Sequence, residues 1–98
     1  VYTSGVIPVD PATGNIAEGV EAQAEQAFKN LCNLVEESGS KVENIIKTTV
    51  FIKEMNDFGT INEIYKKYFK EPFPARSCVE VARLPKDVLL EVEAIAFK

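Results

Sequence analysis

Side chains that could do chemistry gather on the last two strands predicted from the sequence. The first of these strands carries Arg76, Cys78 and Glu80 at alternate positions, and the second carries Glu91 and Glu93. A guanidinium can grip a carboxylate through two parallel hydrogen bonds, and a glutamate can accept a proton. Because the chain contains no histidine, imidazole bases, Ser-His-Asp relays and His-ligated metals are excluded. Acid–base chemistry in this protein must therefore use other side chains, and the carboxylates of Glu91 and Glu93 are candidates.

The composition predicts one globular domain with a single core. The 98 residues are 46% hydrophobic and 27% charged, and the net charge of −4 disfavours nucleic-acid binding, which relies on clustered Lys and Arg. Two cysteines are too few for a four-thiolate zinc site, and we expect reduced thiols in a cytoplasmic protein. No apolar run approaches the ~18 residues of a membrane span, and no secretory signal is visible.

Strand and helix patterns alternate along the chain and must position these side chains. The expected elements are a strand over 1–9, a helix over 20–38, a strand over 45–53, a helix from 58 to about 69, and strands over 75–84 and 88–97. In the first helix an apolar stripe contains Ala24, Phe28, Leu31 and Val35. This order of elements implies an α+β fold with both helices packed on one face of the sheet.

Strand parity divides the expected sheet into an apolar face and a mixed face. Successive strand residues point to opposite faces of a sheet. In the strand over 75–84, one face carries Ala75, Ser77, Val79 and Val81, and we expect this face to pack against the helices. Arg76 and Cys78 then share the mixed face with Glu91 and Glu93. This face is either buried between subunits or solvated with weak surface ion pairs, and parity leaves both alternatives open. The last two strands either form a hairpin or have another strand between them.

The stretch over 74–85, Pro-Ala-Arg-Ser-Cys-Val-Glu-Val-Ala-Arg-Leu-Pro, strongly resembles the signature of the Rid family of reactive-intermediate (enamine/imine) deaminases, also called the YjgF/YER057c/UK114 family. Four further segments agree in order: Thr-Ser-Gly with Ile-Pro over 3–8, Lys-Thr-Thr-Val-Phe over 47–51, Asn-Asp-Phe over 56–58, and Glu-Val-Glu-Ala over 91–94. The resemblance implies a chorismate-mutase-like fold of the Bacillus type. It also implies a homotrimer with clefts between subunits and cofactor-free hydrolysis of 2-imino or 2-enamino acids to 2-keto acids and ammonia.

Two departures from the family pattern stand out. Family members usually begin with a further segment containing Gly-Pro-Tyr-Ser-Gln or similar, whose Tyr reaches the site. The chain begins at Val1 without it, so we expect the family's N-terminal strand to be missing from an otherwise single domain over 1–98. Val6 stands where many relatives have Gln. Neither departure touches the signature arginine.

The resemblance assigns the two leading site residues. Arg76 matches the arginine that binds the substrate carboxylate, and its alternative role is a structural salt bridge to Glu80, Glu91 or Glu93. Glu91 matches the acid that orients or deprotonates the attacking water, and its alternative is a plain partner for a cation. Glu93 has the same parity and is the second choice for this acid.

Three further residues are predicted to bind substrate. Cys78 is interpreted as lining the cleft, with a thiolate nucleophile as the sharper alternative. The Gly5 N–H could help bind the carboxylate, or Gly5 could mark a bulge. Asn62 either reaches the site of a neighbouring subunit or is an ordinary polar residue on the flank of a helix. Cys32, on the first helix, is expected to be buried packing.

Two other functions compete with the deaminase. The same cleft could bind a keto acid without turnover, as a regulatory module. Cleavage of RNA, an activity of some relatives, is disfavoured by the net charge of −4 and by the absence of His and of a basic run. No metal ligand set and no Gly-rich phosphate loop is present.

Overall fold

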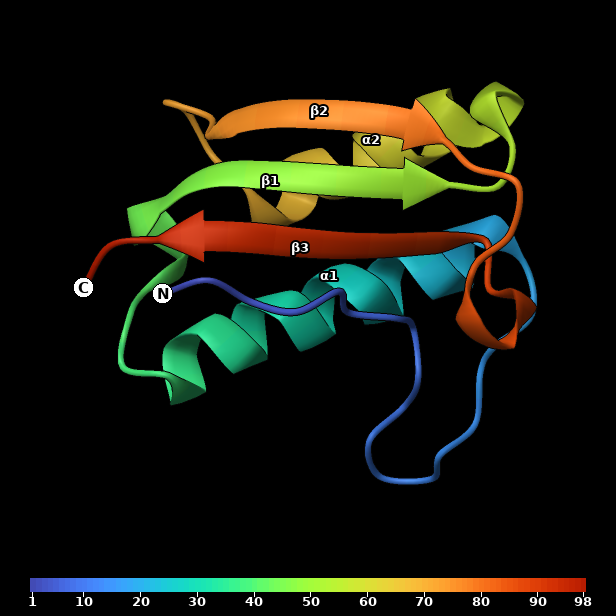
Figure 1. Cartoon of the computed structure of the whole chain (residues 1–98), viewed down its shortest axis with the longest axis horizontal. Coiled ribbons are helices and arrows are strands. Elements are labelled where there is room, and N and C mark those ends of the chain that lie inside the picture. The colour runs from blue at the N-terminus through green and yellow to red at the C-terminus, as the bar shows by residue number, and fades with distance from the viewer.

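Two helices cover one face of a three-stranded sheet in the computed structural model, which describes residues 1–98 (Figure 1). The helices are α1 (Val20–Glu37) and α2 (Phe58–Tyr68), and the strands are β1 (Ile45–Ile52), β2 (Ala75–Glu80) and β3 (Leu90–Ala96). The predicted α+β class, with a mixed sheet and both helices on one face, is confirmed.

The strand order is β2-β1-β3, with β1 parallel to β2 and antiparallel to β3. Of the two arrangements left open by the sequence, the one with a strand between the last two is therefore correct. The strand predicted over 75–84 ends at Glu80, and the strand predicted from 88 begins at Leu90. A turn over Pro85–Asp87 separates them, because Lys86 and Asp87 adopt φ angles of 55° and 56° that no strand tolerates.

The N-terminal segment runs beside β3 but forms no continuous strand (Figure 1). Tyr2 bridges Ile95 and Val6 bridges Val92, so the segment advances by one residue more than β3 between the two bridges. An extra residue of this kind is a bulge-like irregularity, and Gly5 lies within it. The prediction of a regular strand over 1–9 is therefore wrong. The segment nevertheless lies at the edge of the sheet, beside β3.

The core lies between the helices and the sheet. The predicted stripe of α1 is confirmed, since Ala24, Phe28, Leu31 and Val35 are fully buried. Phe28 meets Tyr65 of α2 edge to face, with ring centroids 5.5 Å apart. Burial of each large apolar side chain contributes about 1.5–3 kcal/mol, so this stripe holds α1 against the sheet.

The face of β2 that meets the helices is the opposite of the one predicted. Thr48 and Val50 of β1 are buried beneath the helices, and their partners in β2 are Arg76 and Cys78. The residues that were expected to form the core surface, Ala75, Ser77 and Val79, are exposed on the outer face. Parity relates residues of one strand to each other, but it does not say which set faces the helices, and neither set of β2 was decisively more apolar.

Candidate active site

The guanidinium of Arg76 lies against one face of α2. Its Nη1 donates a 2.6 Å hydrogen bond to Oδ1 of Asn62. Its Cζ lies 4.7 Å from the ring centroid of Tyr65 and 5.2 Å from that of Phe58, both within cation–π range. The three α2 residues follow each other at spacings of four and three, so one helix face presents them together to β2.

No carboxylate pairs with Arg76. The ion pairs of the chain join Lys66 to Glu63, Lys67 to Glu25 and Arg83 to Asp87. Of the three candidate acids, Glu80 instead accepts a hydrogen bond from the backbone of Met55, and Glu91 and Glu93 lie on the outer face of β3 opposite Phe51 and Thr49. The alternative of a structural salt bridge is therefore wrong within one chain, and a half-buried cation remains without an anion.

Glu91 packs beside Gly5 at the irregularity of the N-terminal segment. A Cβ placed on Gly5 would overlap with Oε2 of Glu91 and would lie 2.7 Å from its Cδ. Glycine therefore leaves room for this carboxylate beside the edge of β3. The N–H of Gly5 has no acceptor within the chain, so it is a free donor. The structure thus brings Gly5 and Glu91 together, and it also supports the bulge.

Arg76 and Glu91 lie on opposite faces of the sheet. Arg76 of β2 pairs with Thr48 of β1, and Glu91 of β3 pairs with Phe51 of β1. Since Thr48 and Phe51 are an odd number of residues apart, their side chains point in opposite directions. The expectation that these charges share a face is wrong, and one chain carries two half-sites. We call them the Arg76 half-site (Arg76 and Asn62) and the Glu91 half-site (Glu91 and Gly5).

The two cysteines are protonated thiols at neutral pH. Cys78 is half-buried on the helix side of β2, and burial raises its pKa although Arg76 acts in the opposite direction. This disfavours the alternative of a thiolate nucleophile, and the side chain of Cys78 packs against the hydrophobic core. Burial, assisted by Glu36, raises the pKa of Cys32 to about 11. Cys32 is half-buried rather than fully buried, so its predicted packing role is only partly met.

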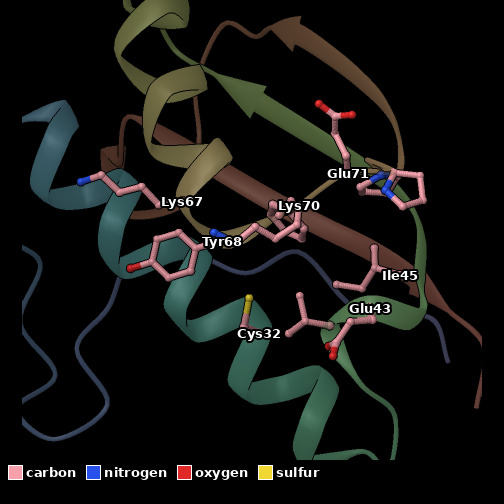
Figure 2. A pocket seen from close by; sticks show the side chains of 11 residues that line it. Cys32, Glu43, Ile45, Lys67, Tyr68, Lys70 and Glu71 are labelled. Atoms are coloured by element: carbon pink, nitrogen blue, oxygen red, sulfur yellow. The ribbon is translucent and has the colours of Figure 1, made fainter.

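Two cavities lie on the helix side. The larger, about 420 Å³, opens between α1, the end of α2 and the start of β1, and Figure 2 shows Cys32 pointing into it from α1. None of the predicted site residues lines it. The smaller, about 290 Å³, lies beside Arg76 and Asn62, and its other walls are Tyr65, Lys66, Phe73 and Pro74. We place the site at the smaller cavity because it contains the unpaired cation.

Two aromatic residues that contact the guanidinium of Arg76 were not predicted from the sequence to belong to the site. Phe58 and Tyr65 belong to the apolar stripe of α2, a pattern that predicts packing, yet their rings also support the guanidinium. Their spacing with Asn62 along α2 was the signal that could have identified them. The chain gathers no group of three or more acidic, Cys or His side chains suited to a metal ion. Neither helix has the length and apolar character needed to cross a bilayer.

Comparison with known proteins places this geometry in a family. The family model described as Endoribonuclease L-PSP matches residues 1–98. A protein of Salmonella typhimurium strain LT2 named 2-iminobutanoate/2-iminopropanoate deaminase is 59% identical, and one of the same name from Escherichia coli K12 is 55% identical. Each alignment covers 100% of this chain and 79% of the relative.

Solved structures agree with the fold. The crystal structure of E. coli TdcF with bound serine is 54% identical, with a TM-score of 0.94 over 99% of this chain and 79% of that one. RidA from the Antarctic bacterium Psychrobacter sp. PAMC 21119 is 38% identical, with a TM-score of 0.96 over the same shares of the two chains. The chain therefore belongs to the Rid (YjgF/YER057c/UK114) family, whose model carries the description Endoribonuclease L-PSP.

Proposed function

We propose that this protein hydrolyses reactive 2-imino and 2-enamino acids, such as 2-iminobutyrate or 2-aminoacrylate, to 2-keto acids and ammonia. The observation that carries the proposal is the unpaired guanidinium of Arg76, which is fixed in place and lacks an anion. A substrate carboxylate supplies that anion. The names of the relatives that are 55% and 59% identical support the same reaction.

The chemistry needs little beyond positioning, because the carbon of a protonated imine is already electrophilic. Arg76 and the free N–H of Gly5 hold the carboxylate of the substrate. Glu91 accepts a proton from water as the water oxygen bonds to the imine carbon. Glu91 then returns this proton to the amino nitrogen. As the C–N bond breaks and ammonia leaves, the hydroxyl oxygen gives its remaining proton to Glu91 and the C=O bond of the keto acid forms. No electrons are exchanged with a cofactor.

We further propose that the complete site forms between subunits of a homotrimer. Arg76 and Glu91 lie on opposite faces of the sheet, so one chain cannot present both to one substrate. The outer face has no helix over it and exposes Val79 by 43%. Covering this face with a second copy both buries apolar surface and brings a Glu91 half-site toward a neighbouring Arg76 half-site.

The reaction is tested by generating 2-aminoacrylate in situ with a pyridoxal-phosphate-dependent dehydratase and measuring keto acid and ammonia release. We expect Arg76→Ala to abolish the acceleration and Arg76→Lys to retain little, because an ammonium cannot reproduce the two parallel hydrogen bonds. Calorimetry with 2-ketobutyrate accompanies the assay. Normal turnover in either variant would refute the role of Arg76, and binding without ammonia release would favour a keto-acid-binding module.

The assembly is tested by complementation between inactive variants. Arg76→Ala and Glu91→Ala chains are co-expressed in equal amounts with different tags, and mixed oligomers are isolated through both tags. If each site takes its Arg76 and its Glu91 from different subunits of a trimer, about a third of the sites in the isolated mixed trimers regain both residues. Complete inactivity of well-folded mixed oligomers would contradict a site between subunits.

A further inference from the structure

Every contact that holds the guanidinium of Arg76 is electrically neutral. The hydrogen-bond acceptor is the amide oxygen of Asn62, and the two flat contacts are the rings of Tyr65 and Phe58. A guanidinium only donates hydrogen bonds, so the amide must present Oδ1 to it and not Nδ2. The guanidinium is therefore oriented by its neighbours, and its positive charge is not compensated by any of them.

Tyr65 is itself held rigidly beneath Arg76. The side chain is 3% exposed, and its hydroxyl shares a 2.7 Å hydrogen bond with the fully buried Thr48 of β1. Its ring lies 4.4 Å from that of Phe69 and meets Phe28 edge to face. Burial raises the pKa of Tyr65, so the hydroxyl stays neutral. A platform with this many fixed partners cannot move away from the cation without breaking the core.

We propose that Asn62 and Tyr65 are positioning residues that fix the guanidinium of Arg76 while leaving its charge free for the carboxylate of the substrate. This inference rests on the proposed function, because it concerns the same site. It assigns Asn62 a role within its own chain, through Arg76, and it assigns Tyr65 a role beyond core packing.

The neutrality of Asn62 is the central element. Aspartate has nearly the same shape and would accept the same hydrogen bond at the same place, but as a carboxylate it would form a stronger, charge-assisted pair. Arg76 would then be held even more firmly, yet its charge would be neutralised before substrate arrived. Asn62→Asp therefore tests separately whether the guanidinium must be held in place and whether its charge must stay unpaired for the substrate carboxylate. Asn62→Ala alone cannot distinguish these two requirements.

The test compares Asn62→Ala and Asn62→Asp with Thr60→Ala, an exposed change on the same helix. Calorimetry measures the Kd for 2-ketobutyrate, and denaturant melts measure stability. We expect Asn62→Ala to weaken binding about tenfold through the loss of a hydrogen bond to a charged group. We expect Asn62→Asp to weaken binding about a hundredfold without loss of stability. Thr60→Ala should match wild type, and KM should rise with Kd while kcat changes little.

Two results would overturn the proposal: wild-type affinity in Asn62→Asp, or a fall in affinity that only follows a fall in stability. Tyr65→Phe keeps the ring and should keep Kd close to wild type, whereas Tyr65→Leu should weaken binding. If Tyr65→Leu does not fold, the Kd values of Asn62→Ala and Asn62→Asp still test the proposal. Equal loss in Tyr65→Phe and Tyr65→Leu would refute the ring as a platform.

A readout without ligand separates this inference from the proposed function. In nitrogen-15 NMR spectra, a held guanidinium gives separate Nη signals for Arg76, and these should merge in Asn62→Ala. If wild type binds 2-ketobutyrate but turns over no imine, the deaminase proposal fails and the Kd series still decides on positioning. If wild type does not bind, the NMR comparison decides, and identical spectra in both proteins would overturn the role of Asn62.

Discussion

Replacing Gly5 by alanine tests the Glu91 half-site with a single carbon atom. The added Cβ would overlap with Oε2 of Glu91 and lie 2.7 Å from Cδ and 3.1 Å from Cγ. Because Gly5 does not have a left-handed backbone, alanine introduces no φ strain. The overlapping atoms are the far end of a flexible side chain, so the carboxylate can retreat by about an ångström at a cost of roughly 0.5 kcal/mol in stability. Misplacement of a reacting group by about 1 Å can lower catalysis about a hundredfold.

We therefore expect Gly5→Ala to fold and assemble normally and to lose about a hundredfold in kcat/KM in the coupled 2-aminoacrylate assay. Gly59→Ala is the matched control, since a Cβ at Gly59 in α2 meets nothing within 4 Å. That control should keep full activity and gain about 0.5–1 kcal/mol in stability, as helical Gly→Ala changes do. Both variants are compared by denaturant melts and by light scattering.

Combining the change with Glu91→Ala completes the test. If Gly5→Ala acts by displacing the carboxylate, it should add nothing to the loss caused by Glu91→Ala, because the two changes remove the same group. Independent, multiplying losses would show that Gly5 acts in another way, for example through its N–H. Full activity of Gly5→Ala with an intact fold would refute the placement of Glu91 as the base.

Three shorter predictions address the cysteines and the outer face. Cys78→Ser should keep most of the activity in the imine assay, because burial raises the pKa of the thiol and disfavours a thiolate nucleophile. Labelling of Cys32 by iodoacetamide, followed by mass spectrometry in a Cys78→Ser background, should be slow at pH 8 and accelerate about tenfold per unit up to its pKa of about 11. Val79→Asp should dissociate the proposed trimer in light scattering and abolish activity together with assembly, since Val79 is 43% exposed on the uncovered face.

The raised pKa of the Cys32 thiol makes the stability of the fold depend on pH in the alkaline range. In the unfolded chain the thiol of Cys32 ionises near its ordinary value of 9.0, whereas in the folded chain its pKa is about 11. Between these values the unfolded state binds fewer protons than the folded state, so stability falls as pH rises. Chemical denaturation at pH 8 and pH 10.5 should show this fall, and Cys32→Ala should reduce it.

Local periodicity in the sequence was sufficient to predict the helices. In α1 the apolar residues Ala24, Phe28, Leu31 and Val35 recur at helical spacing, and each is fully buried. Such a stripe is decided by nearby residues alone, because one helix face must be apolar for the helix to pack. The same holds for the α+β class, which follows from the order of the elements.

The faces of β2 could not be predicted in this way. Arg76 and Cys78 alternate with Ser77 and Val79, so both sets mix polar and apolar groups. Which set meets the helices is decided by pairing with β1, where Thr48 and Val50 are buried. The register of a parallel strand joined through a helix is a long-range property that no local pattern carries. The error then propagated to the site, because it placed Arg76 and Glu91 on one face.

The separation of these two charges has a chemical consequence. A guanidinium and a carboxylate about 4 Å apart attract each other by about 4 kcal/mol at the effective dielectric of a protein surface, and a substrate carboxylate would have to displace that partner. Alternation along β1 and its neighbours makes this self-pairing impossible, since Arg76 and Glu91 point away from opposite sides of one sheet. Within the chain, Arg76 meets only neutral Asn62 and aromatic rings. In the proposed homotrimer, Arg76 and Glu91 therefore each stay unpaired within their own chain until a neighbouring subunit and a substrate bring them together.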